Sequence, residues 1–551
     1  MSEATAVPQT AGAADAPGAE AVDAVDVVVV GAGFSGLYQL HRLRALGLSA
    51  VVFEAGDDVG GTWYWNRYPG ARVDVECINY SFSFSSDLEQ EYRWTERYAP
   101  QPEILKYARH VADRFDLRRD IRFKTRVTAA RWDDPSRTWR VETDPGGAVT
   151  ARYVVMATGC LSAAKVPDIP GTEKFAGPTY HTHHWPHEGV DFTGLRVGLI
   201  GTGSSGVQSI PVIAAQAADL VVFQRTPAYS LPASNRPLHP GELEGVQAQY
   251  SEWRAAQRKS GFGVAVPTPT QSALEVSDEE FGATLQEAWE SGSLTNLLTA
   301  YTDTAVSQDA NDRVRGFVHG KIKQIVQDPQ TAQDLCPEYP VGTKRPCLDT
   351  GYFDTYNRDN VHLVNLQRTP LVEITSRGIR TSDREYEFDV IVYATGFDAM
   401  TGALTRVDFR GKDGLSLKEE WAAGPRTYLG LASAGFPNLF MITGPGSPSV
   451  LTNMMMSIEQ HVDWVTDAIV HLNKAGLHAI EPTRQAQDDW VDHVNEIASY
   501  TLFPKANSWY MGANVPGKTR VFMPYAGGLD VYRDKCDEVA AHDYEGFTLT
   551  A

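Results

Sequence analysis

Cysteine is scarce in this sequence, and its placement excludes several classes of protein. The 551 residues contain five cysteines, an odd number, scattered along the chain without a C-x-x-C pair. A disulfide framework, a cysteine-based zinc site and the redox pair of a disulfide reductase are therefore not expected. Free thiols are typical of a reducing compartment, so we expect a cytoplasmic protein.

Long apolar runs and net positive charge are also missing. No stretch approaches the roughly 20 apolar residues that a membrane-spanning helix needs. The first 26 residues contain no Lys or Arg, so they lack the basic start of a signal peptide. We expect residues 1–25 to form a disordered tail. The formal net charge of −20 argues against a nucleic-acid or anionic-membrane partner.

After this tail, the pattern predicts a strand, a turn, a helix and a second strand. Residues 27–30 are apolar, residues 37–46 have helical periodicity, and residues 50–53 are apolar and end at Glu54. The turn is Gly31-Ala32-Gly33-Phe34-Ser35-Gly36, whose glycines suit a pyrophosphate at the helix N-terminus. Glu54 suits a ribose 2′-hydroxyl and excludes a 2′-phosphate, so this unit fits FAD or NAD.

The same pattern returns later with a different residue at the deciding position. A strand at 195–200, the turn Gly201-Thr202-Gly203-Ser204-Ser205-Gly206, a helix at 207–218 and a strand at 220–224 form the second unit. It ends at Arg225-Thr226, and a cation with a hydroxyl suits a 2′-phosphate. An exposed surface arginine is the alternative interpretation. The two units together predict FAD and NADPH.

Two more apolar strands indicate how the domains are connected. Residues 153–156 and 390–393 each run into Ala-Thr-Gly, and we expect the chain to pass between the nucleotide domains there. The predicted fold is α/β with two Rossmann-like domains, the NADP domain being inserted in the FAD domain. The expected bounds are 26–160 for the first FAD segment, 161–390 for the NADP domain with a helical insertion at about 228–340, and 391–551 for the second FAD segment and the substrate-side wall.

Longer motifs resemble those of one enzyme family over nearly the whole chain from about residue 25. They are Gly60-Gly61-Thr62-Trp63-Tyr64-Trp65-Asn66-Arg67-Tyr68-Pro69-Gly70-Ala71-Arg72-Val73-Asp74, the Phe175-to-Pro186 segment with its His181 and Trp185-Pro186, Val222 to Pro227, Gly342 to Arg345, Gly444 to Ser449, and Asn507 to Tyr510. The chain thereby resembles type I Baeyer–Villiger monooxygenases, closest to the phenylacetone and steroid monooxygenase group.

The resemblance implies a reaction and a catalytic pair. It implies that NADPH reduces FAD, that O2 then gives a C4a-peroxyflavin, and that this species converts a ketone to an ester or lactone. The family's catalytic arginine corresponds to Arg345 and its aspartate partner to Asp74. A permanently protonated guanidinium would stabilise the peroxide anion and the oxyanion that follows. An ordinary ion pair between domains is the alternative interpretation.

Other roles follow from the same resemblance. Lys344 is expected to join Arg225 and Thr226 on the 2′-phosphate. Trp509 is expected beside the nicotinamide ribose and the substrate entrance, with a core aromatic as the alternative. His181 is expected to couple movements of the two domains. It lies near three other histidines, but no metal site is expected because no convincing set of partner ligands accompanies them.

The motifs and the resemblance together predict a set of cofactor-binding residues. They are Gly31, Gly33, Ser35, Gly36, Glu54, Thr62, Trp63, Tyr64, Trp65, Arg72, Asp74, Tyr80, Val127, Gly201, Thr202, Gly203, Ser204, Ser205, Gly206, Gln208, Arg225, Thr226, Lys344, Arg345, Met454 and Trp509.

Substrate and assembly are less constrained by the sequence. The resemblance favours aryl, cyclic or bulky ketones, with steroids as candidates, and the loop at 447–456 is expected to shape the pocket. We expect a monomer or a weak homo-oligomer. The main alternative is a flavin monooxygenase acting on amine nitrogen or sulfur, and a non-catalytic nucleotide-sensing protein is a further one.

Overall fold

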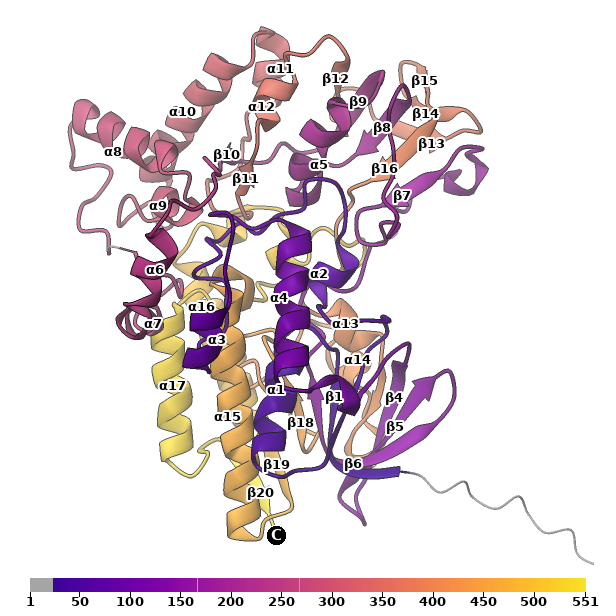
Figure 1. Cartoon of the computed structure of the whole chain (residues 1–551), viewed down its shortest axis with the longest axis vertical. Coiled ribbons are helices and arrows are strands. Elements are labelled where there is room, and N and C mark those ends of the chain that lie inside the picture. Colours follow the sequence, from indigo (N-terminus) through magenta and orange to yellow (C-terminus); the bar gives the residue numbers. More distant parts are fainter. Residues whose placement is uncertain (1–22, 166, 267) are drawn as a thin grey trace, which may run out of the picture.

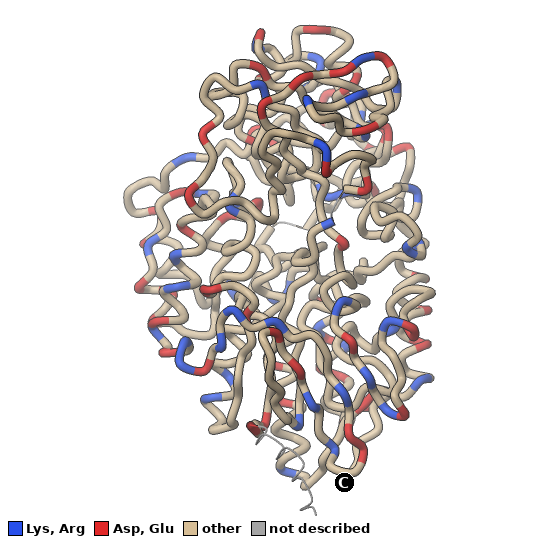
Figure 2. The backbone as a smooth tube through the Cα atoms, turned by 90° about the vertical axis from the view of Figure 1, so that its right-hand side faces the viewer, with Lys and Arg blue, Asp and Glu red and all other residues tan. Residues whose placement is uncertain are grey.

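The computed structural model describes residues 23–165, 167–266 and 268–551. Two sheets, the first mixed and the second parallel, lie in different halves of the molecule, and helices cover both (Figure 1). The predicted α/β class with two Rossmann-like units is confirmed. In the view of Figure 2, positions of both charge signs are interspersed around the outside of the backbone.

In the first sheet, β1 lies between β6 and β2. The sheet runs in the order β17-β4-β5-β6-β1-β2-β3, with β18 paired to β6. Its strands are β1 (Asp23–Val30), β2 (Ala50–Phe53), β3 (Ile121–Arg122), β4 (Arg126–Asp133), β5 (Thr138–Asp144), β6 (Ala148–Met156), β17 (Asp408–Arg410) and β18 (Leu439–Met441).

Both faces of β1 are buried, which explains its uninterrupted apolar sequence. Val27 and Val29 pack into the core that includes helix α1 (Phe34–Ala45), whereas Val28 and Val30 pack with side chains of β4 and β5. Successive side chains of a strand point to opposite faces, so an apolar residue is needed at every position. Helix α15 (Met454–Ala475) lies beside α1, and Gln39 of α1 donates to Thr466 of α15 at 3.0 Å.

The second sheet is parallel throughout and runs in the order β12-β9-β8-β16-β7. Its strands are β7 (Thr179–His181), β8 (Arg196–Ile200), β9 (Asp219–Gln224), β12 (Val361–Asn365) and β16 (Val390–Tyr393), and helix α5 (Ser204–Ala214) follows β8. Because β6 belongs to the first sheet and β7 to the second, the chain crosses between them after β6. It returns after β16, since β17 pairs with β4.

Helices fill most of the segment expected as an insertion, and in Figure 1 most of them lie beyond one edge of the second sheet. They are α6 (Glu242–Gln247), α7 (Tyr250–Arg258), α8 (Asp278–Glu290), α9 (Leu294–Leu298), α10 (Gln308–Ile325) and α11 (Pro329–Asp334). Strand β10 (Ser230–Pro232) opens this segment and pairs in parallel with β11 (Cys347–Asp349) directly after it. The β10–β11 pair therefore closes the base of the insertion.

The remaining α-helices and β-strands are of mixed length. They are helices α2 (Thr62–Trp65), α3 (Ser86–Glu91), α4 (Gln101–Arg114), α12 (Tyr352–Thr355), α13 (Gly402–Thr405), α14 (Leu417–Glu420), α16 (Arg484–Ser499) and α17 (Leu529–Ala541), with strands β13 (Leu371–Ile374), β14 (Gly378–Thr381), β15 (Glu385–Glu387), β19 (Ala479–Pro482) and β20 (Phe547–Thr550).

Several expected boundaries were wrong. Helix α5 ends at Ala214 and not at 218, and β6 begins at Ala148 and not at 153. Strand β1 begins at Asp23, so residues 23–25 of the expected tail belong to it, and the rest of that tail lies outside the described residues. Helices α1 and α5 begin three residues before the expected starts at 37 and 207. The reason is that Gly33 and Gly203 are the N-caps, so the last residues of each glycine motif form the first helical turn.

Within the described residues, no helix combines the length and the apolar character needed to cross a bilayer. All five cysteines are buried and none is in a disulfide.

Candidate active site

Two glycine turns each end in a helix N-terminus without a side-chain cap. Gly33 and Gly203 are the N-caps of α1 and α5, and neither helix has an acidic residue in its first turn. A first turn leaves backbone N–H groups without intrahelical partners, and these groups with the helix dipole favour an anion. The donor set at both places therefore fits a pyrophosphate group.

The third glycine of each turn makes this geometry possible. A Cβ atom on Gly36 would lie 1.8 Å from the carbonyl oxygen of Gly31, and one on Gly206 would lie 2.2 Å from that of Gly201. Only a glycine permits such close packing of the helix on its own turn. The two turns share one construction although they are 170 residues apart.

Glu54 lies at the end of β2 beside the first turn. Its side chain is buried and accepts hydrogen bonds from the backbone N–H groups of Ala32 at 2.8 Å and Gly56 at 2.7 Å. Burial raises the pKa of Glu54, and these two bonds offset only part of that effect. Each carboxylate oxygen has a second lone pair, so Glu54 can still accept from a ribose hydroxyl.

A cluster of cations lies at the corresponding place of the second unit. Arg225 follows β9, and the carbonyl group of its neighbour Thr226 accepts from the Thr202 hydroxyl at 3.0 Å. Burial and the charge of Arg225 lower the pKa of Lys344 to about 8. Burial and the same Arg225 charge lower the pKa of Lys165. Three neighbouring cations that repel one another suit a doubly charged 2′-phosphate.

Lys165 was not predicted from the sequence. It lies in the segment that crosses between the sheets, where its backbone carbonyl group accepts from Thr395 at 3.1 Å and its ammonium group donates to the carbonyl oxygen of Asn514. Nothing in the sequence distinguishes it from a surface lysine, because its hydrogen-bond partners Thr395 and Asn514 lie 230 and 349 residues away.

Arg345 and Asp74 are in direct contact, although 271 residues separate them. The Arg345 Nε donates to Asp74 Oδ2 at 2.7 Å and Nη2 donates to Oδ1 at 3.0 Å, while Nη1 donates to the carbonyl oxygen of Val450 at 2.7 Å. Each side chain of the pair is 27% exposed. Burial alone would lower the pKa of Arg345, but the charge of Asp74 and its hydrogen bonds outweigh burial and raise it.

Tyr510 is a second residue that the sequence argument missed. Its side chain is buried, and its hydroxyl group faces the Arg345 guanidinium. Burial raises the pKa of Tyr510, so the hydroxyl group keeps its proton at neutral pH. The signal was available, because Tyr510 directly follows Trp509 in a recognised motif. The ring centroids of Trp509 and Tyr510 lie 4.3 Å apart.

The segment before Asp74 connects the two nucleotide units. The Tyr68 hydroxyl donates to Oε1 of Gln208 on α5 at 2.8 Å, and the Gln208 side chain donates to the carbonyl oxygen of Arg72 at 3.0 Å. The Arg72 side chain itself is bonded to Glu96 at 2.5 Å. Gln208 therefore touches the first unit directly, while the Arg72 guanidinium is engaged by protein groups.

The other predicted residues lie at several distinct places. In and after α2, the indole N–H of Trp63 donates to the Tyr80 hydroxyl at 3.2 Å, and Trp65 lies beside two histidines with centroid distances of 6.0 and 5.8 Å. Met454 opens α15. Val127 in β4 is buried in the core that contains Val28 and Val30, on the face of the sheet opposite α1. Only its backbone could therefore contact a cofactor.

The remaining predicted residues stand at the starts of helices. Thr62 and Tyr64 belong to α2, and Tyr64 donates to Asp57 at 2.6 Å. In the glycine turns, the Ser35 hydroxyl donates to the carbonyl oxygen of Ala157 at 3.2 Å, and Ser204 accepts from Cys347 at 3.3 Å. Ser205, next in the chain, follows Ser204 in α5.

His181 joins the crossing segment to the strand that returns. Its Nε2 lies 3.2 Å from the Thr395 hydroxyl and 3.3 Å from the carbonyl oxygen of Lys165. Burial lowers the pKa of His181, so the ring is neutral at pH 7. Across the described part of the chain, no group of three or more His, Cys, Asp or Glu side chains is arranged to hold a metal ion.

The structure contains two glycine turns that fit anions, with a carboxylate beside one and cations beside the other. These features define a protein of the two-dinucleotide flavoprotein class. Residues 24–240 match the family described as flavin-binding monooxygenase-like. A solved steroid monooxygenase bound to NADP is similar to this chain, with 53% identity, a TM-score of 0.92, and 96% of this chain and 99% of that chain covered.

Curated relatives narrow the family further. A Baeyer-Villiger monooxygenase of Pseudooceanicola batsensis is 43% identical over 522 residues, covering 94% of both chains. The phenazine N-monooxygenase PhzNO1 of Lysobacter antibioticus is 41% identical over 523 residues, covering 94% of this chain and 96% of its own. This chain belongs to the Baeyer–Villiger monooxygenase family, and the expected family and the cofactors FAD and NADP are confirmed.

Proposed function

We propose that this chain converts ketones to esters or lactones, consuming NADPH and O2. The observation that carries the proposal is the guanidinium of Arg345, which three hydrogen bonds fix between Asp74 and Val450. FAD fits the first glycine turn and Glu54, and when reduced by NADPH it supplies the activation of O2.

The chain contributes a fixed positive charge to this chemistry. Arg345 has five N–H donors, and three of them are used in holding it. One donor on each terminal nitrogen remains for the reaction, in which negative charge develops on the carbonyl oxygen of the ketone. A preorganised cation stabilises that charge without reorganisation. Asp74 keeps the guanidinium in position and reduces its net field.

The second site holds the coenzyme through its extra phosphate. We propose that Arg225, Thr226, Lys344 and Lys165 bind the 2′-phosphate of NADPH, while the N-terminus of α5 binds the pyrophosphate. Support comes from the charge of Arg225, which is close enough to lower the pKa of both Lys165 and Lys344. Trp509 and Met454 are proposed to border the nicotinamide and the substrate, because both are partly buried and pack against the small core cluster that contains Val450.

The remaining assignments are proposals of the same kind. The domain bounds 26–160, 161–390 and 391–551 are supported by the crossings after β6 and β16. A coupling role of His181 is supported by its bonds across that crossing. The five free buried thiols support a cytoplasmic setting. We propose a monomer or weak homo-oligomer, and aryl, cyclic or bulky ketones, steroids included, in view of the similar steroid monooxygenase.

Oxygenation of nitrogen is a second candidate, because a relative of 41% identity is named a phenazine N-monooxygenase. The two functions differ in the product. We would incubate the FAD-loaded protein with NADPH, O2 and panels of ketones, thioethers and aromatic amines. The proposal expects ketone-stimulated NADPH consumption and a product heavier by one oxygen that hydrolyses as an ester. Turnover of amines with every ketone inert would contradict it.

A further inference from the structure

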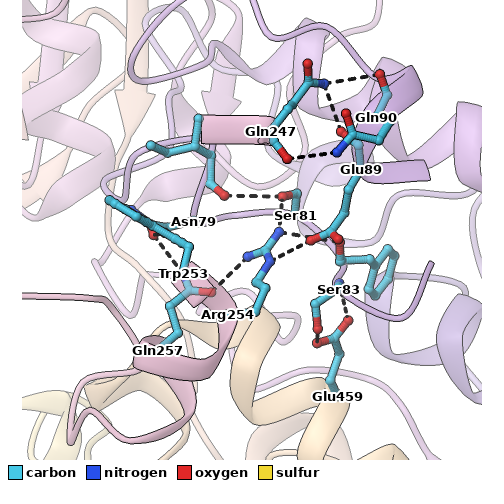
Figure 3. A network of polar contacts seen from close by, with 12 residues as sticks. Asn79, Ser81, Ser83, Glu89, Gln90, Gln247, Trp253, Arg254, Gln257 and Glu459 are labelled. Atoms are coloured by element: carbon cyan, nitrogen blue, oxygen red, sulfur yellow. Dashed lines mark hydrogen bonds and ion pairs between the residues drawn. The ribbon is translucent and has the colours of Figure 1, made fainter. Parts of the chain in front are cut away.

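Helix α7 of the helical segment turns a polar face toward the first nucleotide unit (Figure 3). The indole N–H of Trp253 and the amide of Gln257 both donate to the side-chain oxygen of Asn79 at 2.7 Å. Between them, Arg254 donates to the Ser81 hydroxyl at 2.8 Å. Arg254 and Gln257 are buried, so these bonds form a dry polar contact between distant parts of the chain.

An ion pair strengthens the same contact. Arg254 Nε donates to Oε1 of Glu89 on α3 at 2.8 Å, and the two side chains are 3% and 9% exposed. Burial raises the pKa of Glu89, and the charge and hydrogen bond of Arg254 offset part of this. Breaking a buried pair of this kind costs more than its formation contributes, so α7 is firmly attached.

Asn79 connects α7 to the loop that precedes α15. It is 1% exposed, and its backbone carbonyl group accepts from Nδ2 of Asn453 at 2.7 Å. Asn453 is also buried, and its own oxygen caps α15 by accepting from the N–H of Met455 at 3.1 Å. Its second donor contact is with the carbonyl oxygen of Gly263 at 3.2 Å.

The two residues that accept hydrogen bonds from Arg345 are each close in sequence to one of these asparagines. Val450, whose carbonyl group accepts from Arg345, lies three residues before Asn453. Asp74, which accepts the other two bonds, lies five residues before Asn79. The short connections leave little freedom for either anchor once the asparagines are fixed.

We propose that Asn79 and Asn453 are positioning residues for the reaction, which hold the segment 447–453 and thereby the Arg345 guanidinium in register with α7. The inference rests on the proposed function, because Arg345 is its target. A cation that drifts by about 1 Å loses much of its effect on a transition state. If the segment 447–453 is held less firmly, we expect NADPH and O2 to be consumed without formation of the ester.

Asn453→Ser tests the inference with little damage to the fold. Serine caps a helix as well as asparagine does, but it cannot reach the carbonyl oxygens of Asn79 and Gly263. Trp253→Phe removes one hydrogen-bond donor to Asn79 without changing a residue of the segment 447–453. Trp289→Phe is its matched control, because Trp289 lies in α8 of the same helical segment and its indole N–H makes no hydrogen bond within the described residues.

The first measurement is hydrogen exchange of the FAD-loaded protein without ketone. We expect exchange in peptides covering 447–453 to rise about fivefold in Asn453→Ser, as for loss of one net hydrogen bond, and to rise less in Trp253→Phe. Peptides of β1 and the Trp289→Phe variant should match the wild type. Exchange at 447–453 equal to the wild type in Asn453→Ser would overturn the proposal.

The second measurement is the amount of ester formed per NADPH consumed. This ratio does not depend on how much protein is folded, so a merely structural role would not change it. We expect it to fall at least about threefold in Asn453→Ser, with flavin reduction by NADPH unchanged. Faster exchange of residues 447–453 with an unchanged amount of ester per NADPH would overturn the proposal. A wild type that makes no ester would refute the proposed function, and the exchange comparison would still decide whether Asn453 holds the segment.

Discussion

Replacement of Arg345 by alanine should slow oxygenation of ketones at least about a hundredfold while leaving the reduction of the flavin by NADPH intact. The side chain donates three hydrogen bonds, two to Asp74 and one to Val450, and none to the glycine turns. The first half-reaction therefore loses no contact that the structure shows. The second loses the fixed cation beside the developing negative charge.

The size of the loss follows from electrostatics. A unit charge about 4 Å from another is worth about 4 kcal/mol at an effective dielectric constant of about 20. Asp74 lies 2.7 Å from Nε and cancels part of this field. Removal of one preorganised donor typically costs about 10² to 10³ in kcat, or about 2.7–4 kcal/mol, and we expect a loss in that range.

Two further variants separate charge from geometry. Arg345→Lys keeps the charge but cannot donate to Asp74 and Val450 at once, so its rate should lie between those of alanine and wild type. Arg345→Ala leaves the Asp74 carboxylate without its two bonds from the guanidinium, which lowers stability by about 1–3 kcal/mol. The double variant with Asp74→Ala should recover part of that stability and none of the activity.

The assay is a stopped-flow measurement of flavin reduction by NADPH, paired with product analysis after incubation with ketone and O2. Reduction should stay within about twofold of the wild type, and ester should fall at least about a hundredfold. Ester formation by Arg345→Ala within about threefold of the wild type would refute the reasoning, because no other described cation is bonded to Asp74.

Three other predictions follow from the two nucleotide units and their contact. The pKa of Lys344 is about 8 before coenzyme binds, so the preference for NADPH over NADH should fall as pH rises through about 8. Lys344→Ala and Arg225→Ala should lower this preference at every pH. The ratio of the KM values for the two coenzymes measures it. A methyl group on Gly203 meets no described atom within 4 Å, whereas one on Gly206 meets backbone at 2.2 Å. Gly203→Ala should therefore keep the wild-type Tm and bind NADPH weakly, and Gly206→Ala should lower the Tm. Arg254→Met should lower the free energy of unfolding by about 3–5 kcal/mol in denaturant titrations, because it leaves a buried carboxylate unpaired.

Opposite outcomes would contradict each of these. A pH-independent coenzyme preference would remove Lys344 from the phosphate site. Equal Tm values for the two glycine variants would show that the turn relaxes around Gly206. An unchanged free energy of unfolding in Arg254→Met would show that water reaches the ion pair. Tryptophan-to-phenylalanine replacement at Trp289 serves again as a control for changes in the helical segment.

The sequence by itself determined both nucleotide units. An apolar strand, a glycine turn, a periodic helix and a second apolar strand are local patterns, and the bounds of β2 and β16 agree with the expected ones. The residue after each second strand, Glu54 or Arg225, is likewise local, and it is the basis for the proposal that the two units bind different coenzymes. The starts of α1 and α5 were wrong because the glycine motifs themselves form the first turns.

Only the tertiary structure decided which distant residues meet. The pairing of Asp74 with Arg345 spans 271 residues, and that of Asn79 with Asn453 spans 374. The family resemblance named the first pair, but no resemblance or spacing pointed to the second pair or to Lys165. The physical reason is that strand and helix periodicity acts over a few residues, whereas these contacts arise where two sheets and a helical segment pack against one another.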